Sequence, residues 1–166
     1  MRELTFRRDL RETDREAIAA ILRSSGAFRE QEVLVGLELL EETLNPRPET
    51  DYLWLVAEDR SSRIHGFVCF GAVPMTEGTF DLYWIVVARE ARGRGVATSL
   101  ESQVVERVRS MGGRWLLAET SSQATFLSAR RFYEKTGYSL LETIPDFYRE
   151  GNDRLTYGKR VDRADP

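Results

Sequence analysis

The stretch that decides the fold is residues 86–100, "VVAREARGRGVATSL". Here an apolar strand end meets a corner with three arginines and two glycines, and an amphipathic helix then begins. Gly93 and Gly95 permit positive φ angles and a close approach of the backbone to a ligand. The first amides of a helix are unpaired and carry a partial positive charge, so they bind phosphate groups. The stretch predicts a polyanion site, with a sharp turn and solvated arginines as the simpler alternative.

Two common phosphate motifs are missing from the chain. No Gly-x-x-x-x-Gly-Lys-Ser/Thr sequence occurs, and "GRGVAT" lacks the third small residue of the dinucleotide fingerprint. A nucleoside triphosphate or nicotinamide site is therefore not expected.

Composition narrows the class of protein. A chain of 166 residues fits one domain, 1–166, with a core of its own. A net charge of −3 argues against a nucleic-acid partner. His65 and Cys69 are the only residues of their kinds, too few for a disulfide or a zinc site, so we expect no metal and assign both to packing. No apolar run approaches the ~20 residues of a membrane helix, so we expect no membrane partner and a cytoplasmic protein.

Periodicity predicts the order β-α-α-β-β-β-α-β-α-β-β. The run 79–87 is so apolar that we expect it to be a central strand buried on both faces. A capping box from Thr13 to Glu16 is expected to start the first helix, and Gly137 to end the last one in a left-handed cap. We expect "PDFYREGN", 145–152, to be a polar loop and 162–166 to be frayed. The predicted strands are 3–10, 51–59, 63–73, 79–87, 114–120, 138–144 and 153–161, and the helices are 13–26, 30–44, 94–111 and 125–137.

Two motifs carry a family resemblance. Arg92-x-x-Gly95-x-Ala97 after a strand resembles the phosphate loop Gln/Arg-x-x-Gly-x-Gly/Ala of the GNAT superfamily, the acetyl-CoA-dependent N-acetyltransferases. "ARRFYEKTGY", 129–138, resembles the fourth helix of that family. The resemblance covers essentially the whole chain. It implies an α/β (α+β) fold whose mixed, mostly antiparallel sheet splays between the fourth and fifth strands and is flanked by about four helices.

The resemblance also implies which residues hold acetyl-CoA, the co-substrate. The backbone of Ile85, Val86 and Val87 would pair with the pantetheine arm. One departure concerns Phe126, which stands where many members have an asparagine seven residues before the tyrosine; the loop before it also looks about two residues longer than usual. Amides of the loop would hold the pyrophosphate, and the loop comprises Arg92, Gly93, Arg94, Gly95, Val96, Ala97 and Thr98.

Acetyl transfer needs a neutral amine, and with a pKa near ~10.4 fewer than about one alkylamine in a thousand is neutral at pH 7. A base, or a route for the proton to water, is therefore part of the barrier. Glu119 and Asp81, on the fifth and fourth predicted strands, are the candidates, and either would attract a cationic acceptor. Alternatively, Glu119 caps a turn and Asp81 is a solvated strand end.

Tyr133 matches the general acid of the family, which donates to the departing CoA thiolate. Moving a proton from a phenol near ~10 to a thiol near ~8.5 is uphill by about 2 kcal/mol, so a hydrogen bond to the thiolate is the more plausible role. Packing beside Phe132 is the alternative, weakened because adjacent residues do not share a helix face.

The predicted function is transfer of acetyl from acetyl-CoA to a primary amine of a small molecule or peptide by direct attack in a ternary complex. Tyr83, Phe147 and Tyr148 are candidate walls of the acceptor site. The adjacent aromatic residues Phe147 and Tyr148 make a protein N-terminal acetyltransferase an alternative function. Two further alternatives are a catalytically idle acetyl-CoA sensor and a scaffold with a vacant phosphate loop. A homodimer through an exposed last strand is also left open.

Overall fold

The computed structural model describes residues 4–45 and 51–162, and its chain forms two compact units. The first unit is Met1–Gly71 with Trp84–Val104, and the second is Ala72–Tyr83 with Val105–Pro166. Expectations for residues 3 and 163–166 lie outside the described residues. The order of helices and strands is the predicted one.

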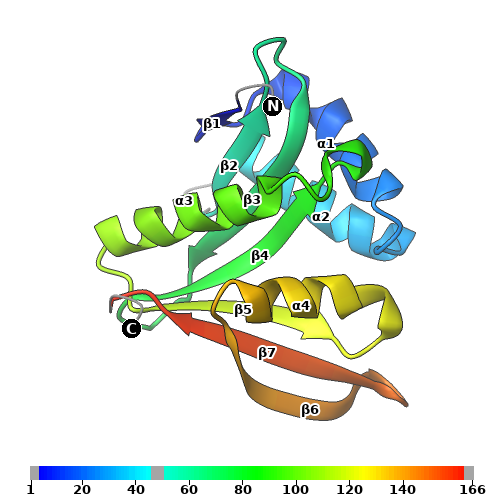
Figure 1. Ribbon diagram of the computed structural model, residues 1–166, viewed down its shortest axis with the longest axis vertical. Coiled ribbons are helices and arrows are strands. Elements are labelled where there is room, and N and C mark those ends of the chain that lie inside the picture. The colour runs from blue at the N-terminus through cyan, green and yellow to red at the C-terminus, as the bar shows by residue number, and fades with distance from the viewer. Residues whose placement is uncertain (1–3, 46–50, 163–166) are drawn as a thin grey trace. The chain divides into compact units, whose positions relative to one another are not determined.

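The first unit combines an antiparallel sheet with two packed helices (Figure 1). Its strands follow the order β1-β2-β3. Helices α1 and α2 carry the buried side chains Ile18, Leu22, Val33 and Leu40. The elements are β1 (Thr5–Arg7), α1 (Arg15–Ser24), α2 (Glu30–Leu44), β2 (Leu53–Glu58), most of β3 (Ile64–Ala72), the end of β4 (Thr79–Val87) and the first turns of α3 (Val96–Ser110).

The start of α1 differs from the prediction. A single 3-10 turn, Glu12–Asp14, precedes the helix, and the carboxylate of Asp14 accepts the Arg11 amide at 2.8 Å. Asp14 is also held at 2.9 Å by the guanidinium of Arg7, and both side chains are buried. The expected Thr13–Glu16 capping box is therefore wrong, because the N-cap is Arg11, whose amide is bound by the Asp14 carboxylate that Arg7 holds in place.

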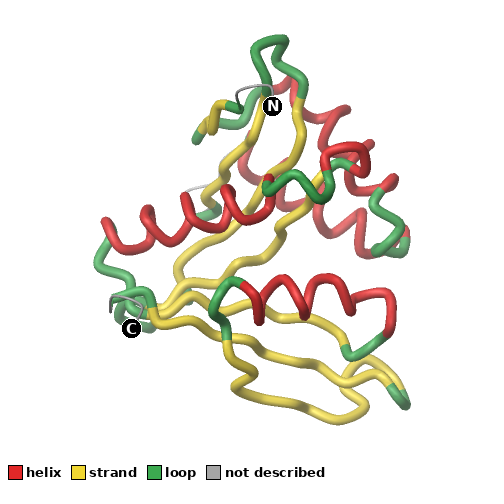
Figure 2. The backbone as a smooth tube through the Cα atoms, viewed as in Figure 1, coloured by secondary structure: helices red, strands yellow, loops and turns green. Residues whose placement is uncertain are grey.

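The second unit is a four-stranded sheet with a helix along one face (Figures 1 and 2). Thr79–Asp81 of β4 pair in parallel with Trp115–Leu117 of β5. The remaining pairs are antiparallel, in the order β4-β5-β7-β6. The other elements are β5 (Trp115–Ser121), α4 (Leu127–Lys135), β6 (Ser139–Arg149) and β7 (Asn152–Arg160).

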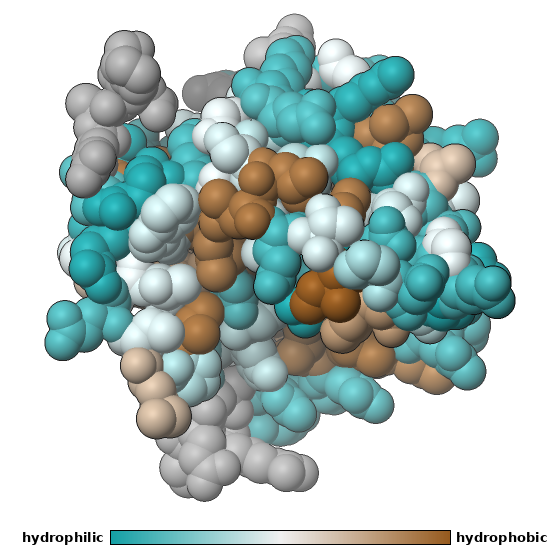
Figure 3. Space-filling view, turned by 90° about the horizontal axis from the view of Figure 1, so that it is seen from below, coloured by the Kyte–Doolittle hydropathy of each residue, from teal (hydrophilic) through white to brown (hydrophobic). Residues whose placement is uncertain are grey.

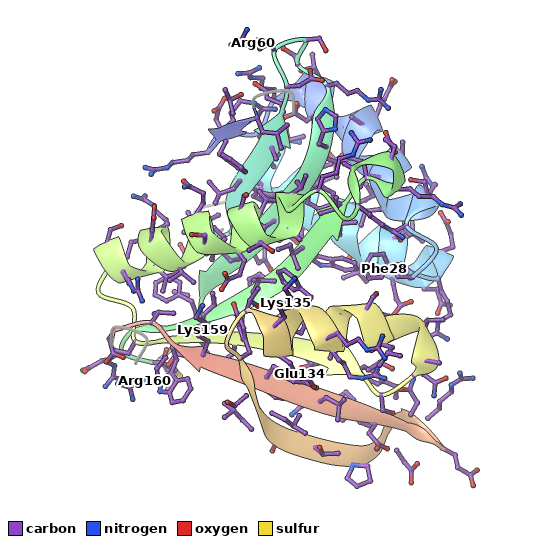
Figure 4. The ribbon with its side chains drawn as sticks, in the orientation of Figure 1. Phe28, Arg60, Glu134, Lys135, Lys159 and Arg160 are labelled. Atoms are coloured by element: carbon purple, nitrogen blue, oxygen red, sulfur yellow. The ribbon has the colours of Figure 1, made fainter. Side chains whose placement is uncertain are left out.

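Helix α4 is fastened to β7. Tyr157 donates to Glu134 at 3.2 Å, and Lys159 donates to the carbonyl of Thr136 at 2.8 Å. Figure 4 labels Glu134 on α4 and Lys159 on β7. Gly137 has φ 88°, and the Tyr138 amide returns to the Tyr133 carbonyl at 3.0 Å. The predicted left-handed cap is confirmed.

Over residues 4–45 and 51–162 the strand order is β1-β2-β3-β4-β5-β7-β6, β4 and β5 pair in parallel, and helices α1 to α4 complete the predicted mixed fold. The β4–β5 register covers three residue pairs at the start of both strands, whereas β5 and β7 pair over seven. This short register is what the predicted splay requires.

Three expectations for strands are wrong. Strand β4 is not buried on both faces: Phe80, Leu82 and Val86 are buried, but Tyr83 is 38% exposed, because the face that carries it is left partly open. The segment 145–152 is not a loop, since β6 continues to Arg149 and only a two-residue turn separates it from β7. The last strand, β7, is interior, so the exposed edge of this sheet is β6.

Candidate active site

The arginine- and glycine-bearing corner lies in the first unit, between the end of β4 and the start of α3. Gly93 has φ 72° and Gly95 has φ 79°, so both adopt the predicted left-handed conformation. No atom lies within 4 Å of a Cβ built on either glycine, so both face open space. Helix α3 begins at Val96, whose side chain is buried, and the Ser99 amide makes its bond to the Gly95 carbonyl. The corner thus joins an open glycine backbone to the N-terminus of a 15-residue helix.

Strand β3 supports this corner from beneath. A Cβ at Gly66 would lie 2.9 Å from the Val86 carbonyl oxygen and 3.2 Å from a methyl group of Val96. The Ala88 amide donates to the His65 carbonyl at 2.9 Å. Gly66 therefore lets the strand end and the helix start approach β3 closely. The sequence pattern did not single out Gly66, because only the three-dimensional contact shows what its missing side chain permits.

The arginines of the corner have different surroundings. Arg92 donates to the carbonyl of Ser25, which follows α1, at 2.8 Å, so its side chain ties the α1–α2 connection to the corner. The side chains of Arg89 and Arg94 are exposed. Arg92 is exposed as well, but its guanidinium is already bonded to the α1–α2 connection.

Strand β4 reaches the corner through the residues predicted to pair with pantetheine. Val86 is buried, while Ile85 and Val87 are half-buried. Trp84 lies edge-on to Phe28 of the α1–α2 connection, with ring centroids 4.8 Å apart; Phe28 is labelled in Figure 4. The α1–α2 connection is thus held at two points, by Arg92 and by Trp84.

The second unit brings several predicted residues together around Glu119. The hydroxyl of Tyr148 donates to Glu119 Oε1 at 2.8 Å. Arg154 Nη1 lies 3.7 Å from Glu119 Oε2, and Arg154 Nη2 donates to Glu142 at 3.2 Å. The guanidinium carbon of Arg154 also lies 4.6 Å from the centre of the Phe147 ring. We call these five residues, Glu119, Glu142, Phe147, Tyr148 and Arg154, the Glu119 cluster.

Sequence reasoning named Glu119, Phe147 and Tyr148 but missed Arg154 and Glu142. The signal needed was the pairing of β5 with β7, which sets Ser121 opposite Arg154 and cannot be deduced from local patterns.

Asp81 lies on the same face as Glu119. The register places Asp81 opposite Leu117, and side chains two apart on a strand share a face, so Leu117 and Glu119 both point to that side. The pKa of Asp81 is raised, first by burial and second by the negative charge of Glu119.

Tyr133 lies on the opposite face of this sheet. Its ring contacts those of Tyr157 and Tyr138, with centroids 5.7 and 5.4 Å apart. Tyr157 is next to Thr156, the partner of Glu119, and therefore points away from Glu119. Burial raises the pKa of the Tyr133 phenol. Within the second unit, the structure therefore does not place Tyr133 and Glu119 side by side.

The loop before α4 carries the departure at Phe126. It ends in a 3-10 turn, Ala124–Phe126, in which the Phe126 amide donates to the Gln123 carbonyl at 3.0 Å. Arg130 donates from α4 to the carbonyls of Ser121 and Gln123, at 2.7 and 2.9 Å. The loop is thus tied to the helix that follows it.

His65 and Cys69 occupy structural positions. His65 Nε2 lies 3.0 Å from a carboxylate oxygen of Asp59, and Cys69 is fully buried, which raises the pKa of its thiol. A thiol with a raised pKa is a poor nucleophile at neutral pH.

Among residues 4–45 and 51–162, no group of three or more His, Cys, Asp and Glu side chains is arranged to hold a metal ion. Within the same ranges, no helix combines the length and the apolar character needed to cross a bilayer.

Comparisons with known proteins identify the class. The family model of the acetyltransferase (GNAT) domain matches residues 50–140. A crystal structure assigned to the GNAT family of acetyltransferases, from Desulfovibrio desulfuricans, is 36% identical over 96% of this chain and 99% of its own, with a TM-score of 0.90. A search of the curated proteins found no match.

More distant structures share the fold. An aminoglycoside 6'-N-acetyltransferase complexed with coenzyme A is 18% identical over 98% of this chain and 99% of its own, with a TM-score of 0.77. The ribosomal-protein-S18-alanine N-acetyltransferase from Escherichia coli is 17% identical over 98% and 97%, with a TM-score of 0.73. The chain belongs to the GNAT acetyltransferase family. It is an enzyme of the acyltransferase class, and the resemblance inferred from its two motifs is confirmed.

Proposed function

We propose that this chain transfers an acetyl group from acetyl-CoA to a primary amine of a small molecule or peptide, by direct attack in a ternary complex. The observation that carries the proposal is the corner at Gly93 and Gly95, with two left-handed glycines facing open space at the start of a long helix. Such a corner suits a diphosphate, because the backbone amides at a helix N-terminus bind phosphate groups.

The residues of the corner fit coenzyme A. Backbone amides of residues 93–98 stand at the helix N-terminus, where negative charge is stabilised. The open space beside both glycines lets phosphate oxygens approach the backbone closely. Exposed Arg89 and Arg94 add long-range attraction. Bound acetyl-CoA supplies the activated acetyl thioester; we assign its pantetheine arm to the backbone of Ile85, Val86 and Val87.

Asp81 and Glu119 are proposed to receive the amine. Two carboxylates on one face attract an ammonium group and offer a place for its proton. The raised pKa makes Asp81 a stronger base than an ordinary aspartate, because a carboxylate that binds its proton more tightly accepts one more readily. Tyr83, on the same face as Asp81 and partly exposed, is proposed as a wall of the acceptor site.

Tyr133 is proposed to stabilise the departing thiolate by donating a hydrogen bond. Burial keeps its phenol neutral, and the raised pKa makes full proton transfer to a thiolate still less favourable than the reference values suggest. In this assignment Tyr133 acts on the departing thiol and Glu119 on the arriving amine.

A protein α-amine is the second candidate acceptor. Phe147 and Tyr148 are adjacent, edge-on to each other at 5.0 Å, and 49% and 43% exposed. A pair of exposed aromatic rings next to a carboxylate suits the first residues of a peptide, with the rings packing on its side chains and the carboxylate binding the terminal ammonium.

The deciding experiment is a thiol-release screen with acetyl-CoA against polyamines, amino acids, aminoglycosides and short peptides. Turnover with any of these supports the proposal, and the best acceptor separates small amines from peptides. Acetyl-CoA binding by calorimetry without thiol release would indicate an idle sensor. Failure of millimolar CoA to raise the melting temperature would indicate a scaffold, since a ligand at 100 times its Kd adds about 2.7 kcal/mol.

We further propose that residues 1–166 act as a single catalytic domain, and that a homodimer, if formed, uses the β6 edge. That strand is exposed along nearly its whole length and carries Leu140 and Leu141, each 50% exposed. Figure 3 shows hydrophobic residues open at the surface among hydrophilic ones on the face that it presents. Sedimentation equilibrium of the wild type and of Leu141→Lys tests the dimer.

A further inference from the structure

The tip of the last hairpin has an irregular backbone that changes where its side chains point. Asp146 adopts φ 54°, and the β6–β7 register shifts between Ile144 and Arg149. The Asp146 amide donates to Asp153 at 3.0 Å, and the Gly151 amide donates to the Asp146 carboxylate at 2.7 Å. A regular strand would send Phe147 and Tyr148 to opposite faces. Because the alternation is broken here, both rings reach the Glu119 cluster.

Glu119 is held at both carboxylate oxygens. Tyr148 of β6 donates to Oε1, and Arg154 of β7 lies beside Oε2. The Glu119 side chain is half exposed, so without these partners it would sample several rotamers in water. The two partners come from different strands of one hairpin and together select one orientation.

Arg154 is itself fixed. It donates to Glu142, its guanidinium lies over Phe147, and its side chain is three-quarters buried. A guanidinium held by a carboxylate and an aromatic face is a rigid support rather than a mobile surface charge. The orientation of Glu119 is therefore set by groups that are positioned in turn by the hairpin.

We propose that Tyr148 and Arg154 are positioning residues that orient the Glu119 carboxylate toward the incoming amine. The proposal rests on the proposed function, because it assigns Glu119 a role with the acceptor. If Tyr148 and Arg154 orient Glu119, substituting either residue lowers turnover of the amine and leaves the affinity for acetyl-CoA unchanged.

The first test uses NMR and needs no turnover. The side-chain carboxyl ¹³C resonance of Glu119, assigned with Glu119→Gln, is measured in the wild type, Tyr148→Phe, Arg154→Lys and a matched control, Arg160→Lys. Arg160 is also on β7, ion-paired with Asp162 and stacked on Trp115 at 5.1 Å, and Figure 4 shows it near the end of β7 away from the hairpin tip. The resonance should move in the first two variants and stay in the control. An unmoved resonance in Tyr148→Phe overturns the proposal.

The second test is kinetic, run with the best acceptor from the thiol-release screen. Tyr148→Phe should lower kcat/KM for the amine about 5–10-fold, somewhat less than a buried hydrogen bond to a charged group would give, because Glu119 is half exposed and screened by water. The KM for acetyl-CoA should not change. In a Glu119→Ala background the same substitution should cost less than about twofold, since its target is gone. Equal losses in both backgrounds overturn the proposal. A wild type that releases no thiol refutes the proposed function instead, and the NMR result still decides the positioning role.

Discussion

Substituting Gly95 by alanine tests the corner most directly. Gly95 has φ 79°, and no protein atom lies within 4 Å of the added Cβ. The methyl group therefore meets no neighbour in the protein, and its cost comes from the left-handed backbone alone, about 1–2 kcal/mol. For a chain of this length, that corresponds to a melting temperature about 2–8 °C lower.

The loss of stability cannot by itself identify a binding site, so a matched control is needed. Gly112, just after α3, has φ 76° and also has no atom within 4 Å of an added Cβ. Gly112→Ala should lower the melting temperature by a similar amount. The two substitutions thus impose the same strain at opposite ends of one helix, and only one of them lies in the corner.

Affinity for acetyl-CoA should separate the two variants. If the Gly95 region donates to the diphosphate, losing one charge-assisted hydrogen bond costs about 1.5–3 kcal/mol, or roughly 10–100-fold in Kd. Isothermal titration calorimetry at fixed salt should show this loss in Gly95→Ala and an unchanged Kd in Gly112→Ala. The reasoning fails if Gly95→Ala binds within twofold of the wild type, or if Gly112→Ala loses as much affinity.

Three further predictions concern single side chains. Tyr133→Phe should lower kcat at least about tenfold in steady-state assays while calorimetry finds acetyl-CoA affinity unchanged, and undiminished kcat would remove Tyr133 from the mechanism. Because the pKa of Asp81 is raised, the folded state holds this proton more tightly than the unfolded state, so stability falls as pH rises. Asp81→Asn should therefore raise the urea midpoint at pH 7 and lose that advantage near pH 3; a lower midpoint at pH 7 would contradict this. Hydrogen bonds from Ser61 and His65 lower the pKa of Asp59, so Asp59→Asn should reduce the melting temperature at pH 7, with the deficit shrinking as pH falls below about 4; a constant deficit would argue against the assignment.

The sequence predicted the helices and strands whose buried face gives a clear periodic spacing of apolar residues. Helix α2 occupies the predicted residues 30–44, and β4 the predicted 79–87. Helix α2 also shows the limit of such patterns. On this helix the apolar residues Leu37 and Leu44 are only half-buried, whereas Gly36 is buried, with Leu22 3.2 Å from where its Cβ would lie. Periodicity identifies the apolar face but not the point of closest approach, which depends on the partner.

The corner was predictable because its chemistry is local. Glycine conformation, helix start and arginine charge all fall within a few consecutive residues, and the structure bears out both positive φ angles. The bond from Arg92 to the Ser25 carbonyl joins residues 67 apart in sequence, and no local pattern encodes it. For the same reason, Glu119 and Tyr148 could each be named as candidates, but their contact with each other and with Arg154 could not be predicted.

The hairpin around residues 145–151 escaped prediction for a physical reason that also bears on function. Strand β6 is exposed on both faces along nearly its whole length, so no buried side imposes an alternating pattern on it. Its Asp and Gly residues serve a bulge and a turn and so look like a loop in the sequence. A segment that contributes so little to the core has no packing requirement for two adjacent large aromatic residues. Phe147 and Tyr148 are nevertheless there, half exposed and directed by the bulge at Asp146 onto Arg154 and Glu119. Since packing does not demand these rings, their placement is best explained by what they hold, and the carboxylate of Glu119 is the group that both the hydrogen bond and the ion pair converge on.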